Sequence, residues 1–356
     1  MKSITNLSYS IHFQSNAYRE LNTFIAAHEP SCIFILVDEN TMEHCYPVLM
    51  PQIVTTSRIE IIEIDAGEEF KNIETCTGVW SALIELGCDR KSLIINLGGG
   101  VVTDLGGFIA STIKRGISFV HIPTTVLGMV DAAIGGKNGV DIGHLKNQIG
   151  VIVPPEMTLI DPTYMYTLDK RQLLNGSIEM FKHGLIADRN YWNQMIKIGD
   201  HYLSEEFENL IYQSAVIKNN VVNTDPYEQG PRKALNYGHT IGHAIESFCL
   251  STSDQDSLLH GEAIAAGLYL ESYLSHLHTG LSKNDFQEIK KWYRNLNRKL
   301  SFSDSDIKKM LGLMTYDKKN VNGEIRFVLL TSIGRFKTDQ TVPELDVIHS
   351  FELLKN

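Results

Sequence analysis

The sequence predicts an α/β N-terminal domain with a Rossmann-like parallel sheet, followed by a mainly α-helical C-terminal domain. The chain has 356 residues, too many for one typical domain and enough for two separate cores. Its first part alternates short β-branched runs with helical stretches, which is typical of doubly wound parallel sheets. After about residue 161 the apolar residues recur mainly at helical spacing. We therefore expect one domain over residues 1–161 and a second over residues 162–356.

Five strands and a helix are expected in the first domain. Residues 1–14 alternate polar and apolar side chains like a first strand. Four further runs of β-branched and apolar residues predict buried strands, and a segment of helical period separates two of them. The further strands are expected at 32–37, 58–64, 92–97 and 117–123, and the helix at 72–86.

The second domain is expected to consist of long helices. A segment with three prolines, VIVPPEMTLIDPTYMYTLD, marks the boundary between the part with alternating strands and helices and the mainly helical part. The helices are expected at 169–186, 203–222, 235–250 and 260–277.

Charge and cysteine content exclude several classes of protein. Acidic side chains outnumber basic ones, 42 against 32, and the net charge is −10. Such a charge repels a nucleic-acid backbone unless the basic residues are segregated, so we expect no nucleic-acid partner. The five cysteines are scattered and form no CxxC pair, which fits a reducing compartment. The sequence has no signal-peptide pattern and no long apolar segment, so we expect a cytoplasmic protein without membrane spans.

A glycine-rich turn follows one of the predicted strands. SLIINLGGGVVTDLGGF places Gly98, Gly99 and Gly100 after a strand and before a helix. Glycines let the backbone approach a pyrophosphate, and the helix offers free N–H groups. The segment predicts phosphate or dinucleotide binding, although GxGxxG spacing is absent and a plain turn is an equal alternative. Asp38 and Asn40 also follow a strand, either to bind ribose hydroxyls or to cap a helix.

Cationic side chains gather in another glycine-rich segment. KRG, which contains Arg115, is followed by PTTVLGMVDAAIGGKNGVDIGHLKNQIG, which contains Asp131, Lys137, Lys146 and Asn147. Lysines there would act as mobile point charges, and the guanidinium could grip two phosphate oxygens. We interpret this segment as a loop that wraps an anion. A glycine-rich β-hairpin with solvated lysines is the alternative.

Histidines and a carboxylate indicate a metal site in the helical domain. His239 and His243 are four residues apart in LNYGHTIGHAIE and project from one helix face. LLHGEAIAAG adds His260, and NGSIEMFKHG adds Glu179 with Lys182 three residues later. Two or three imidazoles with a carboxylate form a typical catalytic shell for a divalent metal. Spacing alone leaves open whether His243 binds the metal, because an i, i+4 pair often binds jointly.

These motifs form one ordered series. GGGVVTDLGGF, KRGISFVHIPTTVLGMVDAAIGGKNGVD, KNQIG, NGSIEMFKHGLI, RKALNYGHTIGHAIE and HGEAIAAG closely resemble, in order and spacing, the motifs of 3-dehydroquinate synthases. The resemblance runs from about residue 38 to residue 334. It implies an NAD-binding α/β domain followed by a metal-binding helical domain. Departures are mild: Thr103 stands where the family usually has Gly, Asn138 where Thr is common, and the loop between His243 and His260 is long.

The resemblance implies a role for each matching position. The metal ligands would be Glu179, His239 and His260. His243 would transfer protons in contact with substrate, Glu228 matches a proton acceptor, and Arg115 would reach substrate from a neighbouring subunit of a homodimer. The other substrate contacts would be Asp131, Lys137, Asn147, Lys182, Lys218, Arg232, Asn236 and either Lys318 or Lys319. The NAD contacts would be Asp38, Asn40, Glu68, Lys71, Gly99, Gly100, Asp104, Thr124, Thr125 and Lys146.

The implied reaction converts 3-deoxy-D-arabino-heptulosonate 7-phosphate to 3-dehydroquinate and phosphate in the shikimate pathway. The resemblance also implies that the protein uses two cofactors, NAD and a divalent metal, Zn or Co. NAD is transiently reduced, phosphate is eliminated, the hydride returns and an intramolecular aldol step closes the ring. A cationic pocket with Lys137, Asn147, Asn236 and His243 would stabilise the departing phosphate.

Three other functions compete with this one. Another sugar phosphate cyclase would act on a substrate without a carboxylate, but Lys218 and Arg232 match the pair that holds the substrate carboxylate in the family. A metal-dependent polyol or glycerol dehydrogenase would share the glycine turn and the helical metal domain, yet would not need the phosphate-binding lysines. A non-catalytic regulator is disfavoured because all three expected metal ligands are present.

Overall fold

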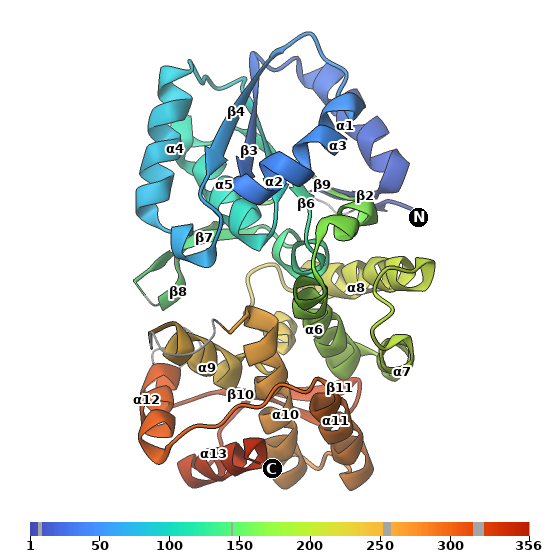
Figure 1. Ribbon diagram of the computed structural model, residues 1–356, viewed down its shortest axis with the longest axis vertical. Helices are drawn as coiled ribbons and strands as arrows, with labels where there is room; N and C mark the ends of the chain where they lie inside the picture. Colours follow the sequence, from blue (N-terminus) through green and yellow to red (C-terminus); the bar gives the residue numbers. More distant parts are fainter. Residues whose placement is uncertain (6–8, 144, 252–257, 316–323, 356) are drawn as a thin grey trace. The chain divides into compact units, whose positions relative to one another are not determined.

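The computed structural model describes residues 1–5, 9–143, 145–251, 258–315 and 324–355. The chain forms two compact units: Met1–Gly176 with Leu203–Asn219, and Ser177–Tyr202 with Asn220–Asn356. The first holds the blue to cyan elements of Figure 1, and the second holds the gold to red ones. This division into compact units does not test the expected domain boundary at residue 161, which stays a prediction.

The first unit is built on a seven-stranded sheet with the order β1-β2-β9-β6-β5-β3-β4. Neighbouring strands are parallel except β1 and β2, which pair antiparallel. β5 is buried along its whole length, as expected of a strand covered on both faces. The strands are β1 (Ile4–Thr5), β2 (Ser10–Phe13), β3 (Cys32–Asp38), β4 (Arg58–Ile64), β5 (Leu93–Gly98), β6 (Ser118–Pro123) and β9 (Met157–Ile160).

Helices and a hairpin complete the first unit. The helices are α1 (Gln14–His28), α2 (Glu39–His44), α3 (Tyr46–Leu49), α4 (Ile73–Glu85), α5 (Gly100–Thr112) and most of α8 (Glu205–Thr224). The antiparallel hairpin consists of β7 (Lys137–Ile142) and β8 (Leu145–Ile152).

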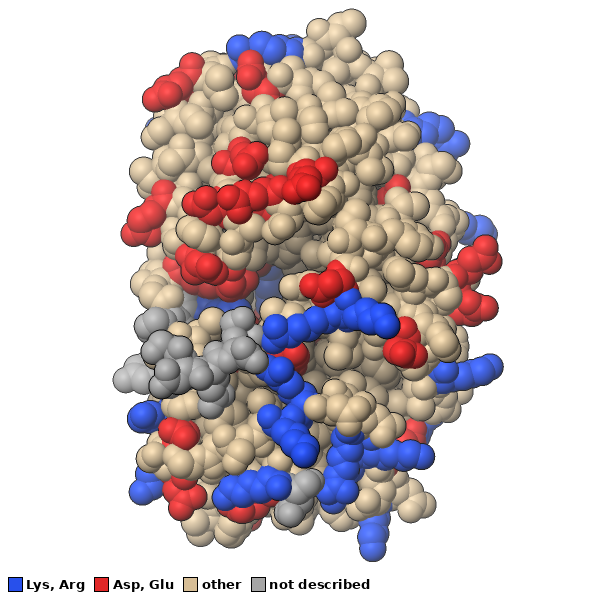
Figure 2. All heavy atoms as spheres, in the orientation of Figure 1, with Lys and Arg blue, Asp and Glu red and all other residues tan. Residues whose placement is uncertain are grey.

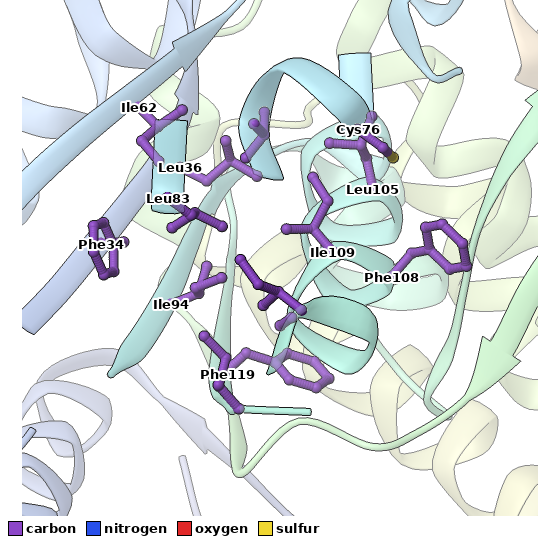
Figure 3. Packing of buried hydrophobic residues seen from close by; sticks show 14 of the residues in the cluster. Phe34, Leu36, Ile62, Cys76, Leu83, Ile94, Leu105, Phe108, Ile109 and Phe119 are labelled. Atoms are coloured by element: carbon purple, nitrogen blue, oxygen red, sulfur yellow. The ribbon is translucent and has the colours of Figure 1, made fainter. Parts of the chain in front are cut away.

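A hydrophobic core lies between the sheet and helices α4 and α5, as Figure 3 shows. Leu36 and Ile94 belong to its strands, and Leu83 and Leu105 to its helices. Leu83 and Leu105 are 0% exposed, and burial of such a side chain stabilises the fold by about 1.5–3 kcal/mol. This packing holds α5 on the sheet and thereby fixes the turn between β5 and α5.

The second unit is mainly helical, with one small sheet. Its helices are α6 (Lys170–Ala187), which begins within the first unit, α7 (Arg189–Ile198), α9 (His239–Ser251), α10 (His260–His278), α11 (Lys283–Asn295), α12 (Asp304–Thr315) and α13 (Glu344–Phe351). Strands β10 (Phe327–Ser332) and β11 (Arg335–Gln340) pair antiparallel. Helices α9 and α10 approach closely, because a Cβ at Gly267 would collide with the carbonyl oxygen of Gly238.

The expected fold class and most expected elements are confirmed. Strand 58–64 has the expected bounds, and the strands expected at 32–37 and 117–123 differ from β3 and β6 by one residue at one end. The strand expected at 92–97 is β5, which is shifted by one residue at both ends. Helix 72–86 is α4, flanked by Asn72 as N-cap and Leu86 as C-cap. The expected helices 169–186, 203–222 and 260–277 correspond to α6, α8 and α10. In the described part of the chain, no helix combines the length and apolar character needed to cross a bilayer.

Three expectations are wrong in detail. The N-terminal segment forms two short antiparallel strands where one strand was expected. The alternation of polar and apolar side chains does not reveal where a strand reverses. Helix 235–250 begins only at His239: Gly238 has a φ of +81°, and a 3₁₀ turn that opens with Pro231 precedes it. The presumed anion loop is a π-helical turn, Gly128–Ala132, followed by the β7–β8 hairpin. The hairpin of the alternative is therefore present, but Lys146 forms an ion pair with Glu68, and anion binding by this segment stays a prediction.

Candidate active site

Two loops at the carboxyl ends of β3 and β5 form the first candidate site. The chain continues from β3 to its neighbour β4 on one side and from β5 to β6 on the other. The topological switch point, where doubly wound sheets bind ligands, therefore lies between the carboxyl ends of β3 and β5. β5 ends at Gly98, α5 begins at Gly100 with Gly99 as its N-cap, and Asp38 ends β3.

The glycines of this turn are closely surrounded. A Cβ at Gly99 would lie 3.1 Å from Cγ2 of Thr125, and a Cβ at Gly100 would lie 3.3 Å from Ala132. The hydroxyl of Thr103 donates to the carbonyl oxygens of Gly99 and Gly100 at 3.2 and 3.1 Å. Thr103, which stands where the family usually has Gly, therefore stabilises the turn. The bare backbone at the start of a helix fits the pyrophosphate of NAD.

Asp38 and Asn40 follow β3 at the other side of the switch point. The carboxylate of Asp38 accepts a hydrogen bond from the backbone N–H of Thr41 at 2.7 Å and caps α2. The helix cap is thus confirmed; Asp38 is only partly buried, and its contact with a ribose stays a prediction. Asn40 is exposed, whereas Thr124, after β6, is 1% exposed.

A buried ion pair ties the β7–β8 hairpin to α5. Lys71 is 4% exposed, and its Nζ lies 2.6 Å from Oδ2 of Asp104 and 2.8 Å from Oδ1 of Asn147. Burial alone lowers the pKa of the Lys71 ammonium, but Asp104 and other carboxylates raise it above its usual value, so the side chain stays charged. Nζ of Lys146 lies 2.9 Å from Glu68. Four expected NAD contacts therefore form two ion pairs.

The expected substrate contacts of the first unit lie in several places. Nζ of Lys218, on α8, lies 2.6 Å from Oδ1 of Asp131, and Lys218 is 7% exposed. Lys137 begins β7 and is exposed. Arg115 is also exposed and, like Lys114, has a positive φ, which is strained for residues other than glycine.

A carboxylate and two imidazoles gather in the second unit. Glu179, on α6, is 0% exposed, and its Oε1 lies 3.6 Å from Nε2 of His239 and 3.5 Å from Nε2 of His260. Two ligand atoms of one tetrahedral zinc, each about 2.0–2.2 Å from the ion, lie roughly 3.3–3.6 Å apart. These separations fit a divalent cation between the three side chains. Lys182, one turn along α6, forms an ion pair with Glu179.

His243 belongs to the same cluster. Ligand atoms of His239, His243 and His260 all lie within 4.8 Å of one another. The rings of His239 and His243, on one face of α9, have centroids 4.9 Å apart. The geometry therefore accommodates His243 either as a ligand or beside the ligands, as its spacing suggested.

Two of these imidazoles have opposite pKa shifts. Burial, followed by the charge of Lys182, lowers the pKa of His239 well below its usual value. Burial also opposes the charge on His260, but the carboxylates of Glu246 and Glu179 raise its pKa to about 9 when no cation lies between them. Neutral imidazole is the form that binds a metal, so a cation at this place displaces a proton from His260.

Asp225 organises a loop that carries three expected substrate contacts. Its carboxylate accepts hydrogen bonds at 3.0, 2.6 and 3.1 Å from the backbone N–H groups of Gln229, Gly230 and Arg232. Arg232 is 1% exposed. Glu228 has a φ of +59° and accepts a hydrogen bond from the amide of Asn236. Strained backbone and buried charge together are typical of functional loops.

Three carboxylates at these sites were missed by sequence reasoning. Glu246 lies 3.2 Å from Nδ1 of His260, Glu271 accepts from backbone N–H groups at the start of α9, and Asp225 holds the loop. The available signal was an acidic residue in an otherwise apolar helical pattern, as in HAIESF and GLYLESYL, or beside Pro and Gly, as in TDPYEQGP. Lys318 and Lys319 lie outside the described residues.

Comparison with known proteins decides the family. Residues 61–175 match the family described as 3-dehydroquinate synthase N-terminal, and residues 176–320 match the one described as 3-dehydroquinate synthase C-terminal. This chain belongs to the 3-dehydroquinate synthase family. It is 40% identical to the 3-dehydroquinate synthase of Parabacteroides distasonis, over 94% of this chain and 95% of the relative. It is 34% identical to that of Streptococcus pyogenes serotype M49, over 92% and 90%.

Solved structures with this fold include other sugar phosphate cyclases. The 2-epi-5-epi-valiolone synthase of Streptomyces hygroscopicus, with NAD+ and Zn2+ bound, has a TM-score of 0.84 and 25% identity over 100% of this chain and 99% of its own. A 2-deoxy-scyllo-inosose synthase with carbaglucose-6-phosphate, NAD+ and Co2+ shares the fold, with a TM-score of 0.83, 23% identity and 96% of each chain covered.

Proposed function

We propose that this chain converts 3-deoxy-D-arabino-heptulosonate 7-phosphate to 3-dehydroquinate and phosphate. The similarity to 3-dehydroquinate synthases along more than nine tenths of the chain carries this conclusion. The chain is accordingly an NAD- and metal-dependent phosphorus–oxygen lyase of the shikimate pathway, which leads to aromatic amino acids.

NAD and a divalent cation, Zn or Co, are the cofactors. When bound, NAD supplies reversible hydride transfer and the cation supplies Lewis acidity. The bound groups of the valiolone synthase support this assignment, as do the switch-point turn and the ligand separations around Glu179. The residues assigned to NAD are Asp38, Asn40, Glu68, Lys71, Gly99, Gly100, Asp104, Thr124, Thr125 and Lys146.

Glu179, His239 and His260 are assigned to the cation. The separations of 3.5 and 3.6 Å support them as one ligand set. His243 is assigned to proton transfer at the substrate, which its position beside His239 supports. Glu228 is assigned as a proton acceptor. The loop held by Asp225 keeps the carboxylate of Glu228 beside Asn236.

The two anionic ends of the substrate require different cations. Lys218 and Arg232 are assigned to the carboxylate; both are buried, and a substrate carboxylate would add opposite charge beside them, as Asp131 already does for Lys218. The departing phosphate is assigned to Lys137, Asn147, Asn236 and His243, with Lys182 and Asp131 as further substrate contacts. Preset donors of this kind stabilise charge that develops during elimination.

An assay of phosphate and NADH tests the proposal against its alternatives. Purified protein with NAD, Zn2+ or Co2+ and the seven-carbon sugar acid phosphate should release phosphate without net NADH. Net NADH would instead indicate a polyol or glycerol dehydrogenase. Turnover of a neutral sugar phosphate, with none of the acid, would indicate another sugar phosphate cyclase.

The site is further proposed to be completed by a second copy of the chain. Arg115, exposed and in a left-handed conformation, is assigned to the substrate of the neighbouring subunit in a homodimer. The protein is proposed to act in the cytoplasm, which its buried free cysteines support.

A further inference from the structure

Glu246 contacts a proposed metal ligand, His260, from the side opposite Glu179. It lies on α9 and is 3% exposed. Its Oε2 is 3.2 Å from Nδ1 of His260, whereas Nε2 of the same ring is 3.5 Å from Oε1 of Glu179. The imidazole of His260 therefore lies between two carboxylates, with one ring nitrogen directed to each.

The second proposed imidazole ligand has a different support. Nδ1 of His239 lies 3.1 Å from the backbone carbonyl oxygen of Tyr237. A carbonyl oxygen is neutral, whereas a carboxylate is charged and draws more strongly on the ring N–H. A carboxylate behind a ligating histidine fixes the tautomer and ring orientation and raises the basicity of the metal-binding nitrogen.

Burial of Glu246 is costly unless its charge is compensated. Its sequence neighbours Ala244, Ile245 and Phe248 are buried apolar side chains, so this stretch of α9 does not by itself require a charged residue. The contact with Nδ1 of His260 gives the buried carboxylate a specific use. It connects α9, which carries His239, with α10, which begins at His260.

We propose that Glu246 is a positioning residue for the metal centre. Its carboxylate holds His260 with the proton on Nδ1, so that the lone pair of Nε2 faces the cation next to Glu179. The inference rests on the proposed function only in assuming a divalent cation at Glu179, His239 and His260.

The test compares full-length variants by their affinity for Zn2+, measured by competition with a chelating dye. Glu246→Gln keeps the size of the side chain and should weaken Zn2+ binding by roughly 10- to 100-fold. Glu262→Gln is the matched control. It removes the same charge two residues from His260, but its carboxylate accepts from the backbone N–H of Leu259, so Zn2+ affinity should stay within twofold of wild type, on the order of measurement error.

The visible spectrum of bound Co2+ supplies a readout that general destabilisation does not move. Glu246→Gln should shift the Co2+ bands because the ligand field of His260 changes, while Glu262→Gln leaves them in place. If Glu246→Gln does not fold, Glu246→Asp replaces it: the shorter carboxylate falls short of Nδ1, and the same loss is expected.

Two results would overturn the inference. Wild-type Zn2+ affinity with an unshifted Co2+ spectrum in Glu246→Gln, or in Glu246→Asp, rejects Glu246 alone and leaves the proposed function intact. A wild-type protein that binds neither Zn2+ nor Co2+ overturns both the inference and the proposed function.

Discussion

Buried charged side chains, held in ion pairs, mark both candidate sites. Glu179 is 0% exposed and Lys182 is 1% exposed, and buried charges are costly unless they are paired. The ion pair between them, one turn apart on α6, offsets that cost when no cation is bound. Lys71 and Asp104 form a comparable pair in the first unit. Such preset charges are typical of catalytic and cofactor sites.

Lys137 is predicted to act on the departing phosphate. Lys137→Ala should lower kcat by roughly 100- to 1,000-fold, because a preset cation is lost where negative charge develops. NAD affinity should be unchanged. Phosphate release at saturating substrate measures the first quantity and NAD titration the second. Lys91→Ala removes another exposed lysine of the same unit and should turn over normally; near-normal turnover of Lys137→Ala rejects its assigned role.

His121 is predicted to make the stability of the protein pH-dependent. It is 2% exposed, and burial lowers its pKa to about 4. The unfolded chain protonates this imidazole below about pH 6.5 whereas the folded chain does not. The stability contributed by neutral His121 is therefore present above about pH 6.5 and is lost as the pH falls toward 4.

Urea unfolding of wild type and His121→Gln measures this effect. The difference in their free energies of unfolding should shrink by up to about 1.4 kcal/mol for each pH unit below 6.5. Taking the difference cancels groups that titrate alike in both proteins. A difference that stays constant between pH 7 and pH 5 would show that His121 titrates alike in both states.

The metal cluster depends on the close packing of helices α9 and α10. His239 and His243 lie on α9, and His260 begins α10. A Cβ at Gly267 would collide with the carbonyl oxygen of Gly238, directly before His239, and a Cβ at Gly242 would lie 2.7 Å from Ile264. The glycines therefore set the separation of the helices that carry the imidazoles.

Gly267→Ala is predicted to damage the metal site through this packing. Overpacking should cost about 1–3 kcal/mol or more and lower Zn2+ affinity, as measured by thermal melting and dye competition. Gly312→Ala on α12 is the matched control, because its Cβ would have no neighbour within 4 Å and should stabilise the helix by about 0.5–1 kcal/mol. Equal Zn2+ affinities of the two variants would show that metal binding does not depend on the close contact between α9 and α10.

Elements with uniform patterns were predictable from sequence, and mixed ones were not. The run RIEIIEI predicted β4 with its bounds, because β-branched residues favour strands. The segment over β7 and β8 was misjudged as a loop because its glycines and lysines hide the strand alternation. Gly238, whose positive φ delays α9, resembles any helical glycine in sequence.

Site residues were predictable where a motif concentrates them. His239, His243 and His260 followed from spacing and family resemblance, and they do gather. The contact between Lys71 and Asn147, 76 residues apart, follows from chain topology that no local pattern encodes. Glu246 was missed because one acidic residue on a helix is ordinarily exposed.

Charge is unevenly distributed over the face of the molecule that Figure 2 shows. Figure 2 shows Lys and Arg side chains gathered mainly over elements of the second unit on this face, and Asp and Glu more often over the first. The net charge of −10 therefore does not prevent local attraction of an anionic substrate. On this face the basic side chains are segregated to a degree that the composition does not reveal.

Mixing two inactive variants tests whether Arg115 serves the neighbouring subunit. Arg115→Ala lacks the donated guanidinium, and His239→Ala lacks a metal ligand. A heterodimer of the two contains one site with both groups, so a refolded or co-expressed mixture should regain phosphate release that neither variant shows alone. Light scattering should give the mass of a dimer. A mixture as inactive as its components would place Arg115 in the site of its own chain.

A crystal of the zinc-loaded protein, examined at the zinc absorption edge, tests the central claim most directly. We predict one anomalous peak within about 2.0–2.2 Å of Glu179, Nε2 of His239 and Nε2 of His260. A peak held by His243 in place of one of these residues, or none near Glu179, would contradict the assigned metal centre and the mechanism built on it.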